Sequence, residues 1–127
     1  MLDDSALARQ GHSLQRRVDR ALARPRTLWV LAVSAMVLDV AITGVGLSLG
    51  LSERNPVARA AIDAIGLFGA GVVLKGGVLA FSYACWRLFP RFLPTTPDHH
   101  RNVVPLGVAV PSWVAVGINT TLILSVL

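Results

Sequence analysis

The sequence predicts an all-α fold, an integral membrane bundle of three transmembrane helices. Two observations support this prediction: 54% of the residues are apolar, and the charged residues occur in blocks separated by long uncharged stretches. A water-soluble domain of 127 residues would show a more even mixture, because charged side chains would cover its whole surface. Lipid is therefore the expected solvent, and the lipid bilayer is the first expected partner.

Three stretches are long enough to cross a bilayer as helices, which takes about 20 residues. Leu28 to Leu51 contains one charged residue, Ile65 to Trp86 contains one, and Val103 to Leu127 contains none. In lipid every backbone N–H and C=O needs a partner within the chain, so such stretches are expected to be helical. We predict spans over about 28–51, 65–88 and 103–126, within a membrane domain of residues 27–127.

The segments outside the spans have their own patterns. Residues 1–26 form a basic segment in which Leu7, Leu14, Val18 and Leu22 share one face of an amphipathic helix predicted over 4–23. A basic tail without regular structure, which only fixes the topology, is the alternative. After the first span, the Asn55-Pro56 pair predicts the start of a short helix over 57–64. The sequence leaves open whether this helix lies on the membrane surface or extends the second span.

Glycine and proline predict how the spans pack and where they end. Gly46 and Gly50 have the small-xxx-small spacing that lets helices approach closely, and the second span is richer still in glycine. We therefore expect tight packing, and a homo-oligomer or a partner membrane subunit. Prolines 90, 94 and 97 predict an irregular loop over 89–102.

The net charge of +5 is interpreted as a topology signal, and no nucleic acid partner is expected. Of the twelve Lys and Arg residues, six precede the first span, three lie between the second and third spans, and only two lie between the first and second. Short loops rich in Lys and Arg stay in the cytoplasm. The ratio of nine to two places a multi-pass protein in the cell membrane, with its N-terminus cytoplasmic and its C-terminus outside.

Two ionisable residues, Asp39 and Lys75, lie inside predicted spans, where a charge is costly to bury. At ~1.5 Å per residue, Asp39 lies roughly 16 Å from the inner end of its span and Lys75 roughly 15 Å from the outer end of its own. In a layer about 30 Å thick the two depths nearly coincide, so the two side chains are expected to face each other.

Other polar residues extend this cluster toward the outer face. Thr43 lies one helical turn beyond Asp39, and Asn119 in the third span is roughly 24 Å from the inner end at ~1.5 Å per residue. Glu53 and Asn55 follow the first span. We predict an intramembrane polar cluster of Asp39, Thr43, Glu53, Asn55, Lys75 and Asn119, arranged as a funnel that opens outward.

The sequence contains no recognised catalytic constellation, and no catalytic residue, metal or cofactor is predicted. No Ser or Cys nucleophile has a nearby His, and no span holds paired carboxylates. Asp98-His99-His100 has metal-ligand chemistry, but it lies in the proline-rich loop without a spaced second set of ligands. These observations favour a protein that is not an enzyme.

The order Asp39-x-x-x-Thr43, Gly50-x-x-Glu53-x-Asn55-Pro56 and Lys75 resembles a family of small prokaryotic multi-pass membrane proteins of unknown function, many of them archaeal. The resemblance covers roughly residues 30–120, and each element is weak by itself while their combination is moderately specific. It implies that Asp39, Glu53, Asn55 and Lys75 belong together, and it implies no activity. The long basic N-terminus is not part of the family pattern.

The leading prediction for function is a structural, accessory or assembly subunit that acts through helix packing. The first alternative is a component of ion or proton-linked transport that uses Asp39 and Lys75, in an oligomer, because three helices enclose little pore. The second alternative is an intramembrane enzyme or a ligand-binding protein with a polar site open to the outer face.

Overall fold

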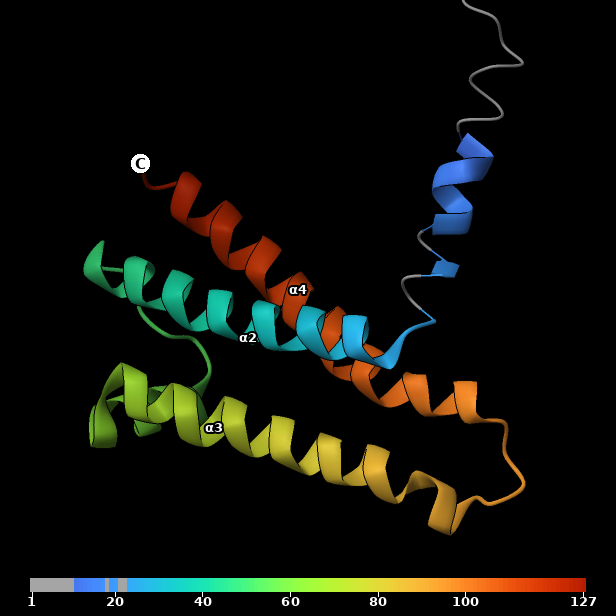
Figure 1. Ribbon diagram of the computed structural model, residues 1–127. Coiled ribbons are helices and arrows are strands. Elements are labelled where there is room, and N and C mark those ends of the chain that lie inside the picture. The colour runs from blue at the N-terminus through green and yellow to red at the C-terminus, as the bar shows by residue number, and fades with distance from the viewer. Residues whose placement is uncertain (1–10, 18, 21–22) are drawn as a thin grey trace, which may run out of the picture.

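The structure, a computed structural model, describes residues 11–17, 19–20 and 23–127. These residues contain no β-strand, and from residue 25 onward four helices follow in the order α2 (Pro25–Ser48), α3 (Pro56–Phe92), the short 3₁₀ helix η1 (Asp98–Asn102) and α4 (Val103–Leu124). Helices α2, α3 and α4 are long and apolar enough to cross a membrane (Figure 1). The predicted all-α fold with three candidate spans is confirmed.

The N-terminal segment is described only in part. Residues 11–17 and 19–20 are helical, whereas residues 4–10, 18 and 21–22 of the predicted amphipathic helix lie outside the described residues. The amphipathic helix therefore stays a prediction.

Helix α2 begins and ends earlier than predicted. Pro25 occupies its first turn, where the missing N–H costs no helical hydrogen bond. At the other end the Leu51 N–H donates to the Gly46 carbonyl (3.0 Å) and the Gly50 N–H to the Leu47 carbonyl (3.1 Å), the pattern of a Schellman motif. Gly50 has a φ of 85°, which suits this position. The interpretation of Gly50 as a packing glycine is wrong, because it terminates the helix.

Helices α2 and α4 pack along a seam of mostly small residues. The buried positions of α2 recur every three or four residues, as do those of α4, so each set forms one stripe. Small side chains allow the two backbones to approach closely. The seam contains Leu28, Ala32, Ala35, Met36, Asp39 and Gly46 from α2, and Pro105, Ala109, Ser112 and Val116 from α4. Helix α3 contacts this pair more sparsely, and Ala70 is its one buried residue.

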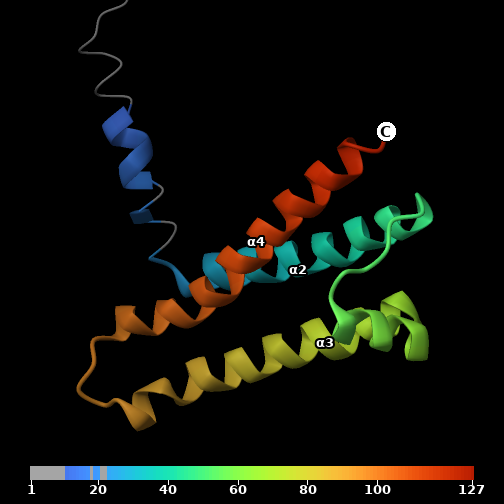
Figure 2. The same ribbon diagram turned by 180° about the vertical axis from the view of Figure 1, so that it is seen from behind.

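The chain between α2 and the main part of α3 is re-entrant. After Gly50 it turns back toward the middle of the bundle, and the first ten residues of α3 then run outward again (Figures 1 and 2). The backbone reverses at Gly66, which has φ 76° and ψ 167° and interrupts the helix. We name residues 51–65 the re-entrant segment. The short helix within it does not continue the main part of α3 in a straight line.

The glycines of α3 differ in their surroundings. A Cβ at Gly71 would lie 3.0 Å from a methyl carbon of Val40, so this glycine does permit close packing on α2. Nothing lies within 4 Å of a Cβ at Gly76 or Gly77. The expected tight packing is therefore wrong for these two positions within a single chain.

At the opposite end of the bundle, aromatic rings of α2 and α3 pack against each other. The Trp29 ring of α2 lies 5.5 Å from Tyr83 and 6.0 Å from Trp86 of α3, centroid to centroid. Pro90 cannot donate to the carbonyl of Trp86, and an Arg101 N–H donates to it instead at 3.2 Å. With this carbonyl satisfied by Arg101, α3 continues past Pro90 to Phe92. Residues 98–102 then form η1. The predicted irregular loop over 89–102 is therefore wrong except at residues 93–97.

Candidate functional site

Asp39 of α2 contacts one polar side chain from each of the other two long helices. The Lys75 ammonium of α3 lies 2.6 Å from one carboxylate oxygen of Asp39 in α2, within salt-bridge distance. The amide N–H of Asn119 in α4 donates to the other carboxylate oxygen at 2.9 Å. Asp39 is buried, with 7% of its surface exposed. Both carboxylate oxygens thus have a partner, as a buried charge requires.

The positions of the helices explain why these three residues meet. Asp39 and Asn119 continue the buried stripes of α2 and α4, so they face each other across the seam. The sequence estimate placed Asn119 well beyond Asp39, and the earlier start of α2, at Pro25 instead of residue 28, removes most of that difference. Counted from the observed helix starts at ~1.5 Å per residue, the two lie roughly 21 and 24 Å along their helices.

Thr43 lies one turn farther along α2, on the face that carries Asp39. Its hydroxyl donates to the backbone carbonyl of Asp39 at 2.7 Å. This bond orients the hydroxyl oxygen and leaves its lone pairs able to accept a hydrogen bond. Thr43 lines the same cavities as the cluster described above.

The re-entrant segment brings Glu53 and Asn55 to this region. Asn55 caps the N-terminus of α3, since its side-chain oxygen accepts hydrogen bonds from the N–H groups of Val57 (3.0 Å) and Ala58 (3.4 Å). One carboxylate oxygen of Glu53 accepts a hydrogen bond from the Asn55 N–H at 2.9 Å. The Arg59 guanidinium donates to the backbone carbonyl of Glu53. These bonds fix the non-helical turn before α3.

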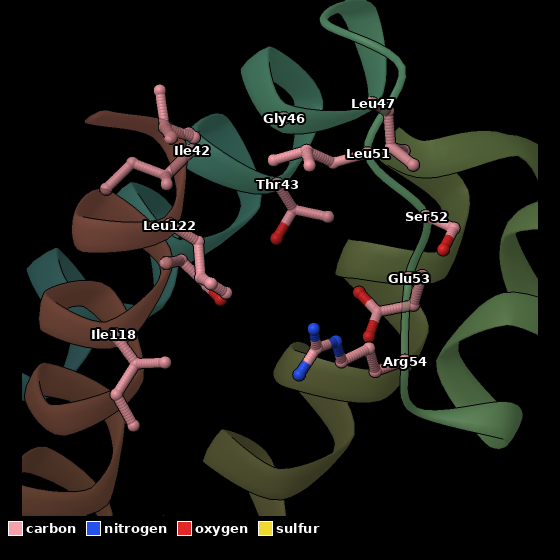
Figure 3. Close-up of a pocket in the computed structure, with 12 residues that line it drawn as sticks. Ile42, Thr43, Gly46, Leu47, Leu51, Ser52, Glu53, Arg54, Ile118 and Leu122 are labelled. Carbon is pink, nitrogen blue, oxygen red and sulfur yellow. The ribbon is translucent and has the colours of Figure 1, made fainter. Parts of the chain in front are cut away.

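Two neighbouring cavities lie among these elements. The first, of about 260 Å³, lies where α2 and α4 end, and Figure 3 shows the side chains of Glu53 and Arg54 directed into it. The second, of about 240 Å³, is lined by Asp39 and Lys75, and we call it the deeper cavity because it lies nearer to the middle of α2 and α3. Thr43, Glu53 and Asn119 line both cavities. All six residues of the predicted polar cluster line one cavity or both.

Lys75 differs from Asp39 in its exposure. Its side chain is 38% exposed, whereas that of Asp39 is 9% exposed. An ammonium group has three N–H donors, and the carboxylate of Asp39 occupies one side of it. The remaining donors are therefore available to a molecule in the deeper cavity.

Sequence reasoning missed two residues of the site, Ser52 and Arg54. Both line the outer cavity, and neither was predicted to belong to the cluster. Arg54 was interpreted only as a topology charge. Its position beside Glu53 is the signal that was available, because a residue next to a predicted site residue in a short loop shares its surroundings.

The described part of the chain contains no group of three or more His, Cys, Asp or Glu residues able to hold a metal ion. The rings of His99 and His100 lie 4.3 Å apart in η1, away from both cavities. Comparison with known proteins adds no homologue: no family model, no curated protein and no solved structure matches the chain.

Proposed function

We propose that this protein binds a small hydrophilic ligand inside the membrane, as a binding or transport component whose polar site is entered from the outer face. The observation that carries the proposal is the partly exposed side chain of Lys75, which lines a cavity together with Asp39 and Asn119 near the middle of a helix long enough to span a membrane. A cation at that depth is strongly disfavoured in contact with lipid tails. Water or a polar ligand in the cavity removes that cost.

The re-entrant segment supports the same proposal. Residues 51–55 are not helical, and Ser52, Arg54 and Asn55 are exposed while Glu53 is half-buried. Non-helical backbone at membrane depth is tolerated only where it is buried in protein or lines a water-filled cavity. These residues are not buried and four of them line the outer cavity, so water in that cavity would satisfy their backbone. Ligand sites of membrane transporters are built from such interrupted helices.

Cysteine accessibility tests the proposal. On a Cys85→Ser background, Thr43→Cys places a thiol at the boundary of the two cavities, and a charged, membrane-impermeant thiol reagent is added to intact cells. We expect Thr43→Cys to be labelled from outside. Val73→Cys is the matched control, since Val73 is 59% exposed on α3 but lines neither cavity. It is expected to face lipid and to stay unlabelled.

Labelling is compared at three positions, Thr43, Val73 and Ser52. Ser52→Cys, in the outer cavity, reports whether the reagent reaches the entrance. Labelling at Ser52 without labelling at Thr43 would show that water stops at the entrance, and the proposed binding site would be wrong. Labelling at Val73 equal to that at Thr43 would also overturn it, because lipid-facing and cavity-facing thiols would then be indistinguishable.

An accessory or assembly subunit is the second candidate function. The open surface around Gly76 and Gly77 favours it, because exposed glycines on a spanning helix suit close contact with a helix of another chain. The two candidates differ in what they require of Lys75. An accessory role tolerates replacement of both Asp39 and Lys75 by uncharged residues, whereas ligand binding in the deeper cavity is lost with the ammonium.

A further inference from the structure

The charges that line the two cavities can be divided into those that neutralise each other and those that do not. Asp39 and Lys75 form a close pair in the deeper cavity. Glu53 and Arg54 line the outer cavity, and neither forms an ion pair with any described residue. One negative and one positive group without an ion-pair partner in the described part of the chain therefore line the same half-open cavity.

Local bonds hold Glu53 in place, whereas Arg54 has none among the described residues. The Glu53 carboxylate is held by the N–H of Asn55, and its backbone carbonyl is held by Arg59. Arg54 makes no hydrogen bond to the described residues, and Figure 3 shows its guanidinium directed into the cavity across from α4. Two separate opposite charges in one cavity attract a ligand that carries the complementary charges, and the attraction grows as the ligand displaces water from between them.

From this arrangement we infer that the ligand is a small zwitterion with a carboxylate and an ammonium a few bonds apart, as in an α-amino acid. The inference rests on the proposed function. Arg54 binds the carboxylate with its planar fork of donors, and Glu53 accepts hydrogen bonds from the ammonium. The side-chain carbonyl of Asn119 and the hydroxyl of Thr43 line the same cavity and supply neutral acceptors.

Two further features agree with this class of ligand. The formal charges of Asp39, Glu53, Arg54 and Lys75 add to zero, so a ligand without net charge leaves the membrane site neutral. A cavity of about 260 Å³ lies just below the ~300–1,000 Å³ of sites for drug-sized molecules, so it has room for a small ligand.

Equilibrium binding to the full-length protein in lipid nanodiscs tests the inference. The probes are glycine, acetate and methylammonium, which carry both charges, only the carboxylate and only the ammonium. We expect glycine to bind roughly ten-fold or more tightly than either single-charge probe, because each of them leaves one charged group of the site without a partner.

Two variants are expected to change the ligand preference in opposite directions, which loss of folding cannot do. Glu53→Gln is expected to remove the preference for glycine over acetate, and Arg54→Gln to remove the preference for glycine over methylammonium. Asp63→Asn is the matched control, since Asp63 is an exposed carboxylate of the same re-entrant segment that lines neither cavity. It should bind glycine as the parent does.

The outcomes separate this inference from the proposed function. Equal affinity for glycine and acetate would identify an anion site and overturn the zwitterion. Absence of glycine binding, with Thr43→Cys still labelled from outside, would overturn the zwitterion and leave the water-filled site standing. Absence of both binding and labelling would overturn the site itself.

Discussion

At the scale of single residues, Asp39 and Lys75 have unequal surroundings although they form one pair. Lys75→Met leaves the carboxylate in the α2–α4 seam with Asn119 as its remaining side-chain partner, whereas Asp39→Asn leaves an ammonium that reaches a polar cavity. We expect Lys75→Met to lower the free energy of unfolding by about 3 kcal/mol and Asp39→Asn by about 1 kcal/mol. Apparent melting temperatures in detergent measure this order.

The double variant Asp39→Asn/Lys75→Met removes both charges, so neither charge is left buried without its partner. Its stability should return to within about 1 kcal/mol of the parent, because the side-chain carbonyl introduced at position 39 can still accept the hydrogen bond from Asn119. Losses that simply add in the double variant would contradict a mutual pair. Equal stability of both single variants and the parent would show that neither charge depends on the other.

Counting depth along the predicted helices brought Asp39 and Lys75 to one level, and these two side chains do form an ion pair. The same count placed Asn119 farther out than Asp39, although its amide donates to the Asp39 carboxylate. Arg54 could not be found this way, because its direction depends on the turn at residues 51–55. That turn is fixed by hydrogen bonds of Glu53, Asn55 and Arg59, which no periodic pattern predicts.

At the scale of elements, the re-entrant segment is bounded by two glycines with positive φ, Gly50 at 85° and Gly66 at 76°. A Cβ at either position would meet nothing within 4 Å, so replacement by alanine costs backbone strain alone. We expect Gly66→Ala to lower the free energy of unfolding by about 1–3 kcal/mol, because its φ/ψ region is almost exclusive to glycine. Apparent melting temperatures in detergent test this loss.

Gly76→Ala is the matched control for Gly66→Ala. Gly76 also has open space around a Cβ, but it lies in regular helix, where alanine is favoured over glycine by roughly 0.5–1 kcal/mol. The two substitutions should therefore have opposite signs. A neutral Gly66→Ala would mean that the reversal of the chain at this residue is wrong.

The elements themselves were predictable, and their connections were less so. The length of the uncharged stretches predicted the three long helices. The Asn55-Pro56 pair predicted the start of α3, since helix caps have local sequence signals. The reversal at Gly66 was not predictable, because a glycine within an apolar run is equally compatible with a packed helix. Only its φ of 76° distinguishes it from Gly76.

At the scale of the whole molecule, the orientation in the membrane decides which compartment supplies the ligand. Nine basic residues lie before the first apolar stretch (28–51) or between the second (65–86) and the third (103–127), against two between the first and second, which favours a C-terminus and a cavity entrance outside the cell. On a Cys85→Ser background, Ser125→Cys follows α4 and Thr95→Cys lies between α3 and η1, and both positions are exposed. We expect an impermeant thiol reagent to label Ser125→Cys on intact cells, and Thr95→Cys only after the membrane is permeabilised. The reverse pattern would place the entrance on the cytoplasmic side, and the ligand would then have to be a cytoplasmic solute.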